Sequence, residues 1–199
     1  MIAASDFLPD VWPHFRRCPD FMIERQIAQA AQKFLRETSL WRETLMVLAA
    51  PGSRDIDLPH GDDWRAHTVL SASRVPGGPL EAVAVERIGG SECGIPTGYA
   101  VLSDRRIRLN RSPDELVRIA IEAALVPTGD NLPAFLTDYR DEIVAGTLAR
   151  LYAQKAETWA DPLLADQYES QFRNCIATAR FNAARGNSGA ELRVRIPRL

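Results

Sequence analysis

The stretch "ETWADPLLADQYESQFRN", residues 157–174, separates two segments that each carry apolar residues at helical spacing. Asp161 is a good N-cap residue and Pro162 suits the first helical position, so a new helix is predicted to begin there. Trp159 has a large apolar side chain with which to anchor the bend. We therefore expect Trp159, Asp161 and Pro162 to form a structural hinge between two antiparallel helices.

Apolar periodicity predicts the helices on both sides of this hinge. The upstream helix, within residues 132–156, carries its stripe at Leu132, Leu136, Tyr139, Ile143, Val144, Leu148, Leu151 and Tyr152. The downstream helix carries its own at Leu164, Tyr168, Phe172, Cys175 and Ala179. A third helix is predicted to begin near Pro19 and to end near Thr38, and it must pack on the other two to bury its apolar face.

Residues 41–126 follow a different pattern, in which short extended pieces are separated by turn residues. A hairpin is expected with its turn at Ser103-Asp104. The segment "DELVRIAIEAAL", residues 114–125, contains helix-favouring Ala and Glu, but Val117, Ile119 and Ile121 alternate, which favours a strand.

These elements predict an α+β fold. It is an antiparallel helical bundle, made of the N-terminal helix and the C-terminal helix hairpin, with a small inserted antiparallel β-domain and an extended C-terminal arm. The expected domains are residues 1–40 with 127–185 for the bundle, 41–126 for the insert and 186–199 for the arm.

Composition favours an ordinary globular protein of 199 residues, with a formal net charge of -2 that gives no reason to expect a general nucleic-acid binder. Cys18, Cys93 and Cys175 form no CxxC pair, so we interpret them as reduced thiols in an intracellular assembly. The sequence shows no basic leader with an apolar run and no apolar stretch of about 18 residues, so we expect neither secretion by that route nor a membrane span.

Candidate chemistry is concentrated between His60 and Cys93. The Gly-rich loop "GGSECGIPTG", residues 89–98, is followed by a strand rather than by the helix that a phosphate site needs. His60 and His67 lack helical metal-ligand spacing and stand in no recognised relation to Cys93. We expect no catalytic residue, metal or cofactor, although an enzyme or ligand-binding protein that uses this region remains the alternative from another class.

The C-terminal segment is basic. Six arginines and one acid between Ser170 and Leu199 give it a net charge of +5. A basic extended segment after Gly186 and Gly189 indicates an interaction arm for an acidic protein surface or for phosphates. The residues expected to bind the partner are Arg193, Val194, Arg195, Ile196, Arg198 and Leu199.

Three stretches, residues 8–43, 94–113 and 131–180, resemble the head-to-tail adaptor (connector) proteins of tailed bacteriophages. They are "LPDVWPHFRRCPDFMIERQIAQAAQKFLRETSLWRE", "GIPTGYAVLSDRRIRLNRSP" and "NLPAFLTDYRDEIVAGTLARLYAQKAETWADPLLADQYESQFRNCIATAR". The strongest matches are Pro96 and Tyr99 before the strand at 107–109, Leu132-Pro133 at a helix start, and the hinge residues.

The resemblance implies a structural virion protein that forms a ring, usually twelvefold, beneath the portal. It implies contacts with the portal protein through the arm, with a nozzle or tail-tube protein and with further copies of itself. Genomic DNA would pass through the ring without sequence-specific binding, and the chain would reside in the host cytoplasm before assembly and at the head-tail interface of the virion afterwards. A tail-completion or tail-terminator ring protein is the alternative within the same class.

Overall fold

The computed structural model describes residues 1–88, 92–155 and 157–185. Contacts divide the chain into two compact units. The helical unit comprises Met1–Leu40 and the residues from Leu132 onward, and the β-unit comprises Trp41–Asn131.

The described part of the helical unit contains four α-helices together with short 3₁₀ and extended pieces. In chain order they are β1 (Ile2–Ala3), η1 (Ala4–Phe7), α1 (Leu8–Val11), α2 (Asp20–Thr38), the second residue of β9 (Asn131–Leu132), η3 (Ala134–Tyr139), α3 (Arg140–Tyr152) and α4 (Pro162–Arg185). β1 and β9 pair as a two-stranded sheet.

The predicted helix over 19–38 is confirmed as α2. Its first residue follows Pro19, whose backbone is extended, and its end is marked by Ser39, which adopts a left-handed conformation with φ 51°. Ile23, Ile27 and Phe34 are fully buried on one face of α2. The 3.6-residue period together with Pro19 at the start was enough to identify this helix.

The helix predicted within residues 132–156 is shorter than expected, because residues 134–139 form the 3₁₀ helix η3 and α3 begins only at Arg140. Leu136 N donates to Pro133 O over 3.1 Å, which is an i to i+3 bond. Over so short a distance, apolar residues spaced three and four apart fit a 3₁₀ turn as well as an α-helix.

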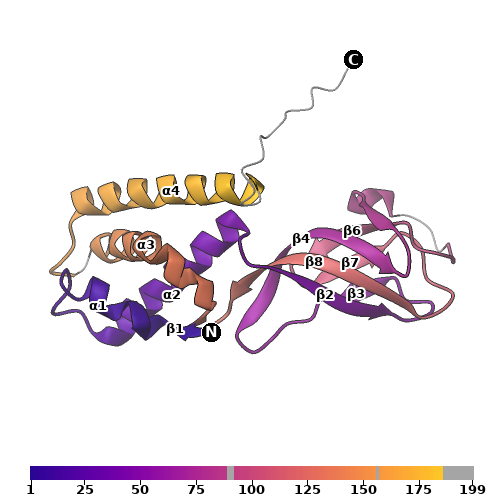
Figure 1. Cartoon of the computed structure of the whole chain (residues 1–199), viewed down its shortest axis with the longest axis horizontal. Coiled ribbons are helices and arrows are strands. Elements are labelled where there is room, and N and C mark those ends of the chain that lie inside the picture. Colours follow the sequence, from indigo (N-terminus) through magenta and orange to yellow (C-terminus); the bar gives the residue numbers. More distant parts are fainter. Residues whose placement is uncertain (89–91, 156, 186–199) are drawn as a thin grey trace, which may run out of the picture. The chain divides into compact units, whose positions relative to one another are not determined.

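The three longer helices, α2, α3 and α4, pack against one another, as predicted for the N-terminal helix and the C-terminal pair. α4 runs along α3 within this unit (Figure 1). Phe34 of α2 and Phe172 of α4 are both fully buried, with ring centroids 6.4 Å apart. The face of α4 turned away from this core remains exposed from Pro162 to Asn182.

The β-unit is a seven-stranded sheet in the order β2-β8-β4-β5-β6-β7-β3. The strands are β2 (Arg42–Ala49), β3 (Asp55–Asp57), β4 (Trp64–Val75), β5 (Pro79–Ala82), β6 (Gly98–Ser103), β7 (Arg106–Leu109) and β8 (Val117–Pro127), with the 3₁₀ turn η2 at Val85–Arg87. The core of the unit includes Leu45, Val47, Ile107, Ile119 and Ile121.

The strand predicted within residues 114–125 is confirmed as β8, which pairs antiparallel with β2 on one side and β4 on the other. Because β8 lies between two other strands, the side chains from Ala123 to Pro127 are all buried and need not alternate with polar ones. This explains why apolar alternation is incomplete along the sequence of β8. The predicted hairpin is confirmed as β6 and β7, which pair antiparallel, but its turn lies at Asp104-Arg105, one residue later than the predicted Ser103-Asp104.

The expected fold, a helical bundle with a small inserted antiparallel β-domain, was wrong. The sheet has seven strands and is nearly closed into a barrel-like form, with the two end strands of its order, β2 and β3, in contact. β5 and β6 pair in parallel, so the sheet is not wholly antiparallel. Strands as short as β3 and β5 carry little periodic signal, and a parallel pairing between distant segments has no local signature.

Candidate functional site

The bend between α3 and α4 contains the three hinge residues predicted from the sequence. Asp161 caps α4: its Oδ1 accepts hydrogen bonds from Leu163 N over 3.0 Å and Leu164 N over 3.1 Å. Pro162 is the first residue of α4. Asp161 N donates to Tyr152 O over 3.0 Å, so the same residue is tied to the end of α3. The cap satisfies two of the backbone donors that a helix start leaves unpaired.

Trp159 belongs to an aromatic cluster that we define as Phe15, Tyr152, Trp159 and Tyr168. Its ring meets Phe15 edge to face with centroids 6.3 Å apart, and Phe15 lies 4.7 Å from Tyr152. Tyr152 of α3 stacks on Tyr168 of α4 at 5.9 Å with only 6° between the ring planes. The cluster therefore joins the N-terminal segment to both helices of the bend.

Trp159 itself is half-buried, and its buried Nε1 has no hydrogen-bond partner among the described residues. Burial raises the pKa of the Tyr152 phenol, and the neighbouring Tyr168 and Asp161 raise it further. The cluster was not predicted from the sequence because Phe15 lies in a segment without periodicity, although Tyr152 and Tyr168 stand on the predicted helical stripes.

A second contact of α4, formed by charged side chains, joins it to α2. Glu169 accepts from Lys33 Nζ over 2.8 Å and from Arg173 Nε over 3.0 Å. Burial of the Glu169 carboxyl acts to raise its pKa, but the hydrogen bonds from Lys33 and Arg173 outweigh that effect and lower the pKa. This contact holds α4 in register on α2.

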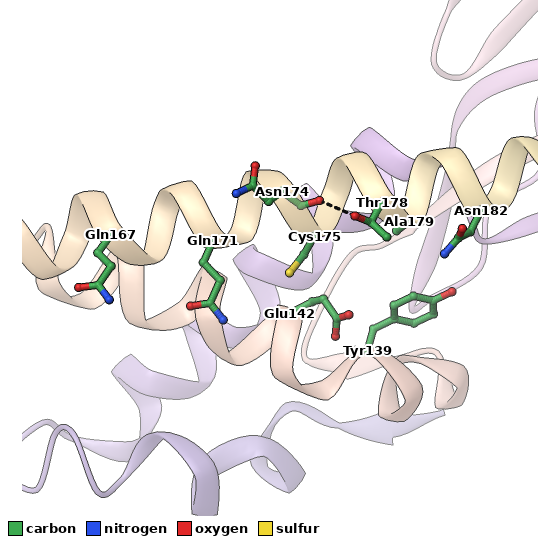
Figure 2. Close-up of a pocket in the computed structure, with 9 residues that line it drawn as sticks. All are labelled: Tyr139, Glu142, Gln167, Gln171, Asn174, Cys175, Thr178, Ala179 and Asn182. Atoms are coloured by element: carbon green, nitrogen blue, oxygen red, sulfur yellow. Dashed lines mark hydrogen bonds between the residues drawn. The ribbon is translucent and has the colours of Figure 1, made fainter.

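An open groove of about 490 Å³, which we call the α3–α4 groove, runs beside α4 (Figure 2). Its lining is Tyr139, Glu142, Gln167, Gln171, Asn174, Cys175, Thr178, Ala179 and Asn182. In Figure 2 the α4 side chains of Gln171 and Cys175 point toward α3, and the carboxylate of Glu142 lies between Cys175 and Tyr139. The exposed polar α4 residues of this lining are all neutral, so the groove offers many hydrogen-bond donors and acceptors but a single charged group.

The groove contains a perturbed thiol. Burial raises the pKa of Cys175, and the negative charges of Glu142 and then Asp141 raise it further. A thiol with a raised pKa is a poor nucleophile at neutral pH, so Cys175 has the character of a structural residue.

The groove could be foreseen from the sequence only in part. Neutral residues stand at spacings of four, three, four and four, at positions 167, 171, 174, 178 and 182. Their common face becomes a groove only because α3 lies beside it.

The His60–Cys93 region does not assemble into one site. His60 lines a hollow with Arg105 and Arg106 at the start of β7, whereas Cys93 forms a bridge with Ser112, beyond the other end of β7. The six residue steps from Arg106 to Ser112 correspond to roughly 20 Å of extended chain. Among the described residues, no group of three His, Cys, Asp or Glu side chains is arranged to hold a metal ion.

Two further expectations from the sequence concern the partner-binding arm and the membrane. The arm residues Arg193, Val194, Arg195, Ile196, Arg198 and Leu199 lie outside the described residues. Within the described part of the chain, no helix has both the length and the apolar character needed to cross a membrane.

The helical unit thus consists of packed helices joined by a capped bend, with an exposed groove rich in neutral amides beside the longest helix. The chain belongs to the SU10 adaptor protein family, whose sequence model matches residues 1–195. It is a structural bacteriophage protein, an adaptor at the head-tail interface, which confirms the resemblance described above. A search of curated proteins finds no match.

Proposed function

We propose that the protein assembles into a twelvefold ring beneath the portal, joins the head to a nozzle or tail-tube protein, and lines the channel through which the genome passes. The observation that carries this proposal is the family match, which extends over residues 1–195 and so includes both units. An adaptor must bind several protein neighbours at once, and a ring offers every copy of each partner an equivalent surface.

The described surface supports a role in protein contacts. Large apolar side chains are exposed in both units, among them Phe21 at 69%, Leu163 at 79%, Leu48 at 60% and Ile95 at 61%. Exposed apolar groups of this size mark interaction sites when they are gathered into patches. We propose that such side chains become covered by the portal, the tail protein and neighbouring copies.

We propose that the basic C-terminal arm, residues 186–199, binds the portal protein. Its arginines alternate with Val194 and Ile196, so an extended chain presents charges on one side and apolar groups on the other. This pattern suits a protein groove better than phosphates alone. Each arm needs only a weak contact, because repetition around the ring multiplies its effect. We further propose that the chain has no catalytic activity, resides in the host cytoplasm before assembly, and contacts the genome without reading its sequence.

The experiment that tests this function is native mass determination of the purified chain, alone and after addition of isolated portal rings. We expect a complex with one adaptor copy per portal subunit. Electron microscopy should then show a ring on one face of the portal, with an open central channel. A chain that stays monomeric and unbound at saturating portal concentration would contradict the proposal.

A further inference from the structure

The groove and the opposite flank of α4 are chemically complementary. On the groove side, Glu142 projects into the α3–α4 groove, and Asp138 and Asp141 are exposed close to it in the chain. Within the described part of the structure, none of these three carboxylates forms an ion pair. The groove is therefore a hydrogen-bonding surface with an acidic wall.

The other surface, which we call the α4 flank, consists of Asp166, Ser170, Arg173, Ala177 and Arg180. These residues recur at spacings of four, three, four and three, and all of them are exposed. Arg180 forms no ion pair with a described residue, and the Arg173 side chain is 72% exposed although it contacts Glu169. The small residues Ser170 and Ala177 lie between the charged ones and allow another backbone to come close.

The two surfaces point in different directions. At 3.6 residues per turn, the centre of the flank lies roughly 140° around the helix axis from the centre of the groove lining. One copy of the chain therefore cannot bring its own flank into its own groove, although a second copy can.

We propose that the α4 flank of one copy binds the α3–α4 groove of the next copy, with Arg180 and Arg173 facing the acidic wall that contains Glu142. This inference rests on the ring of the proposed function and names the contact that closes it. A contact between two different surfaces of identical subunits is head-to-tail, and repetition of such a contact closes into a ring when the rotation allows.

A second copy suits these surfaces better than nucleic acid does. The groove has an acidic wall that repels phosphates, while its amide side chains bond equally well to neutral groups such as Ser170. The flank runs from Asp166 to Arg180, fifteen residues or about 21 Å of helix, which is too narrow a strip for a large isolated interface. We therefore expect rings to form cooperatively, with stable isolated dimers absent.

Charge reversal tests the contact in the full-length chain, with ring formation on portal measured by native mass. Arg180→Glu places like charges across the contact and should lower ring formation roughly tenfold or more, as should Glu142→Arg. The double variant that carries both changes should return to within about threefold of the natural chain. An equimolar mixture of the two single variants should also assemble, because each variant's flank then meets an oppositely charged groove.

Two further measurements separate this contact from loss of folding and from the proposed function. Circular dichroism should show that each single variant keeps the helicity of the natural chain, and labelling of Cys175 by a maleimide should slow at least tenfold in the ring. Rings of the natural chain in which Cys175 remains as reactive as in the free chain would overturn the contact. So would an Arg180→Glu variant that forms rings on the portal as readily as the natural chain does. Failure of the natural chain to form any ring would instead contradict the proposed function.

Discussion

Gly146 of α3 lies directly beneath the ring of Phe172 of α4. A Cβ placed on Gly146 would be 2.9 Å from two ring carbons of Phe172, closer than real Cβ contacts allow. Phe172 is only 1% exposed and has no room to move away. The two helices thus approach as closely as they do because residue 146 has no side chain.

Gly146→Ala should therefore destabilise the helical unit. Alanine favours a helix interior by roughly 1 kcal/mol relative to glycine, but overpacking against a fixed aromatic ring costs about 1 to 3 kcal/mol. We expect a net loss of about 1 kcal/mol in urea unfolding. Gly129→Ala is the matched control, since nothing lies within 4 Å of a Cβ at that position. If Gly146→Ala proves more stable than the natural chain, the close approach of α3 and α4 has been misjudged.

The cap at Asp161 gives a second prediction. Asp161→Ala removes the acceptor for Leu163 N and Leu164 N and should cost about 1 to 2 kcal/mol in the same measurement. Asp161→Asn retains a capping oxygen and should recover most of that loss. Equal stability of the alanine and asparagine variants would show that the cap contributes nothing.

The aromatic cluster predicts a larger effect at the same bend. Trp159→Ala removes an indole that packs on Phe15, and a fully buried tryptophan would cost roughly 3 to 5 kcal/mol. Because Trp159 is half-buried, we expect about 2 to 3 kcal/mol, still more than the loss of the cap. If denaturant unfolding shows that Asp161→Ala lowers stability more than Trp159→Ala, then Trp159 is not the main anchor of the bend.

Stability should depend on pH through Glu169, whose pKa is lowered in the folded chain by Lys33 and Arg173. A lowered pKa means that folding favours the ionised carboxylate. Its contribution is therefore fully present above the ordinary glutamate pKa of about 4.3, and it is lost as the pH falls through the lowered value. Glu169→Gln should thus be less stable than the natural chain at pH 7, and the difference should shrink as the pH falls below 4. An equal difference at both pH values would show that the charge of Glu169 does not matter.

Thiol labelling of the free chain should distinguish the three cysteines. Cys93 is exposed and should react first, whereas burial raises the pKa values of Cys18 and Cys175 and keeps them protonated at pH 7. Labelling of Cys175 should continue to accelerate above the ordinary thiol pKa, because only the thiolate reacts. Glu142→Gln removes one negative charge near Cys175 and should increase its rate modestly, with Cys93 as the internal control. A slower Cys175 in that variant would contradict the electrostatic cause.

Removal of the arm tests the portal contact. A chain that ends at Arg185 retains every described helix and strand and should unfold at the same denaturant concentration as the full chain. Without the arginines of residues 193–198 it should fail to join portal-containing heads, as measured by co-sedimentation. If the shortened chain joins the heads as well as the full chain, the portal contact lies elsewhere.

The sequence by itself determined the elements that rest on local physics. The apolar stripe of Ile23, Ile27 and Phe34 defines α2, and Asp161-Pro162 marks the start of α4 through chemistry confined to one turn. The three family-like stretches were also sufficient for the adaptor assignment, because such a match depends on residues in order along the chain and not on a catalytic centre.

Only the tertiary structure decided how these elements combine. The strands of the β-unit were visible as short extended pieces, but the parallel pairing of β5 with β6 and the approach of β2 to β3 join segments whose partners no local pattern specifies. The aromatic cluster and the α3–α4 groove also depend on tertiary packing. Phe15, Tyr152 and Tyr168 come into contact, and Glu142 lies near Cys175, because packing brings together residues that are distant in sequence. The free energy of that packing depends on several segments at once, so no single segment predicts it.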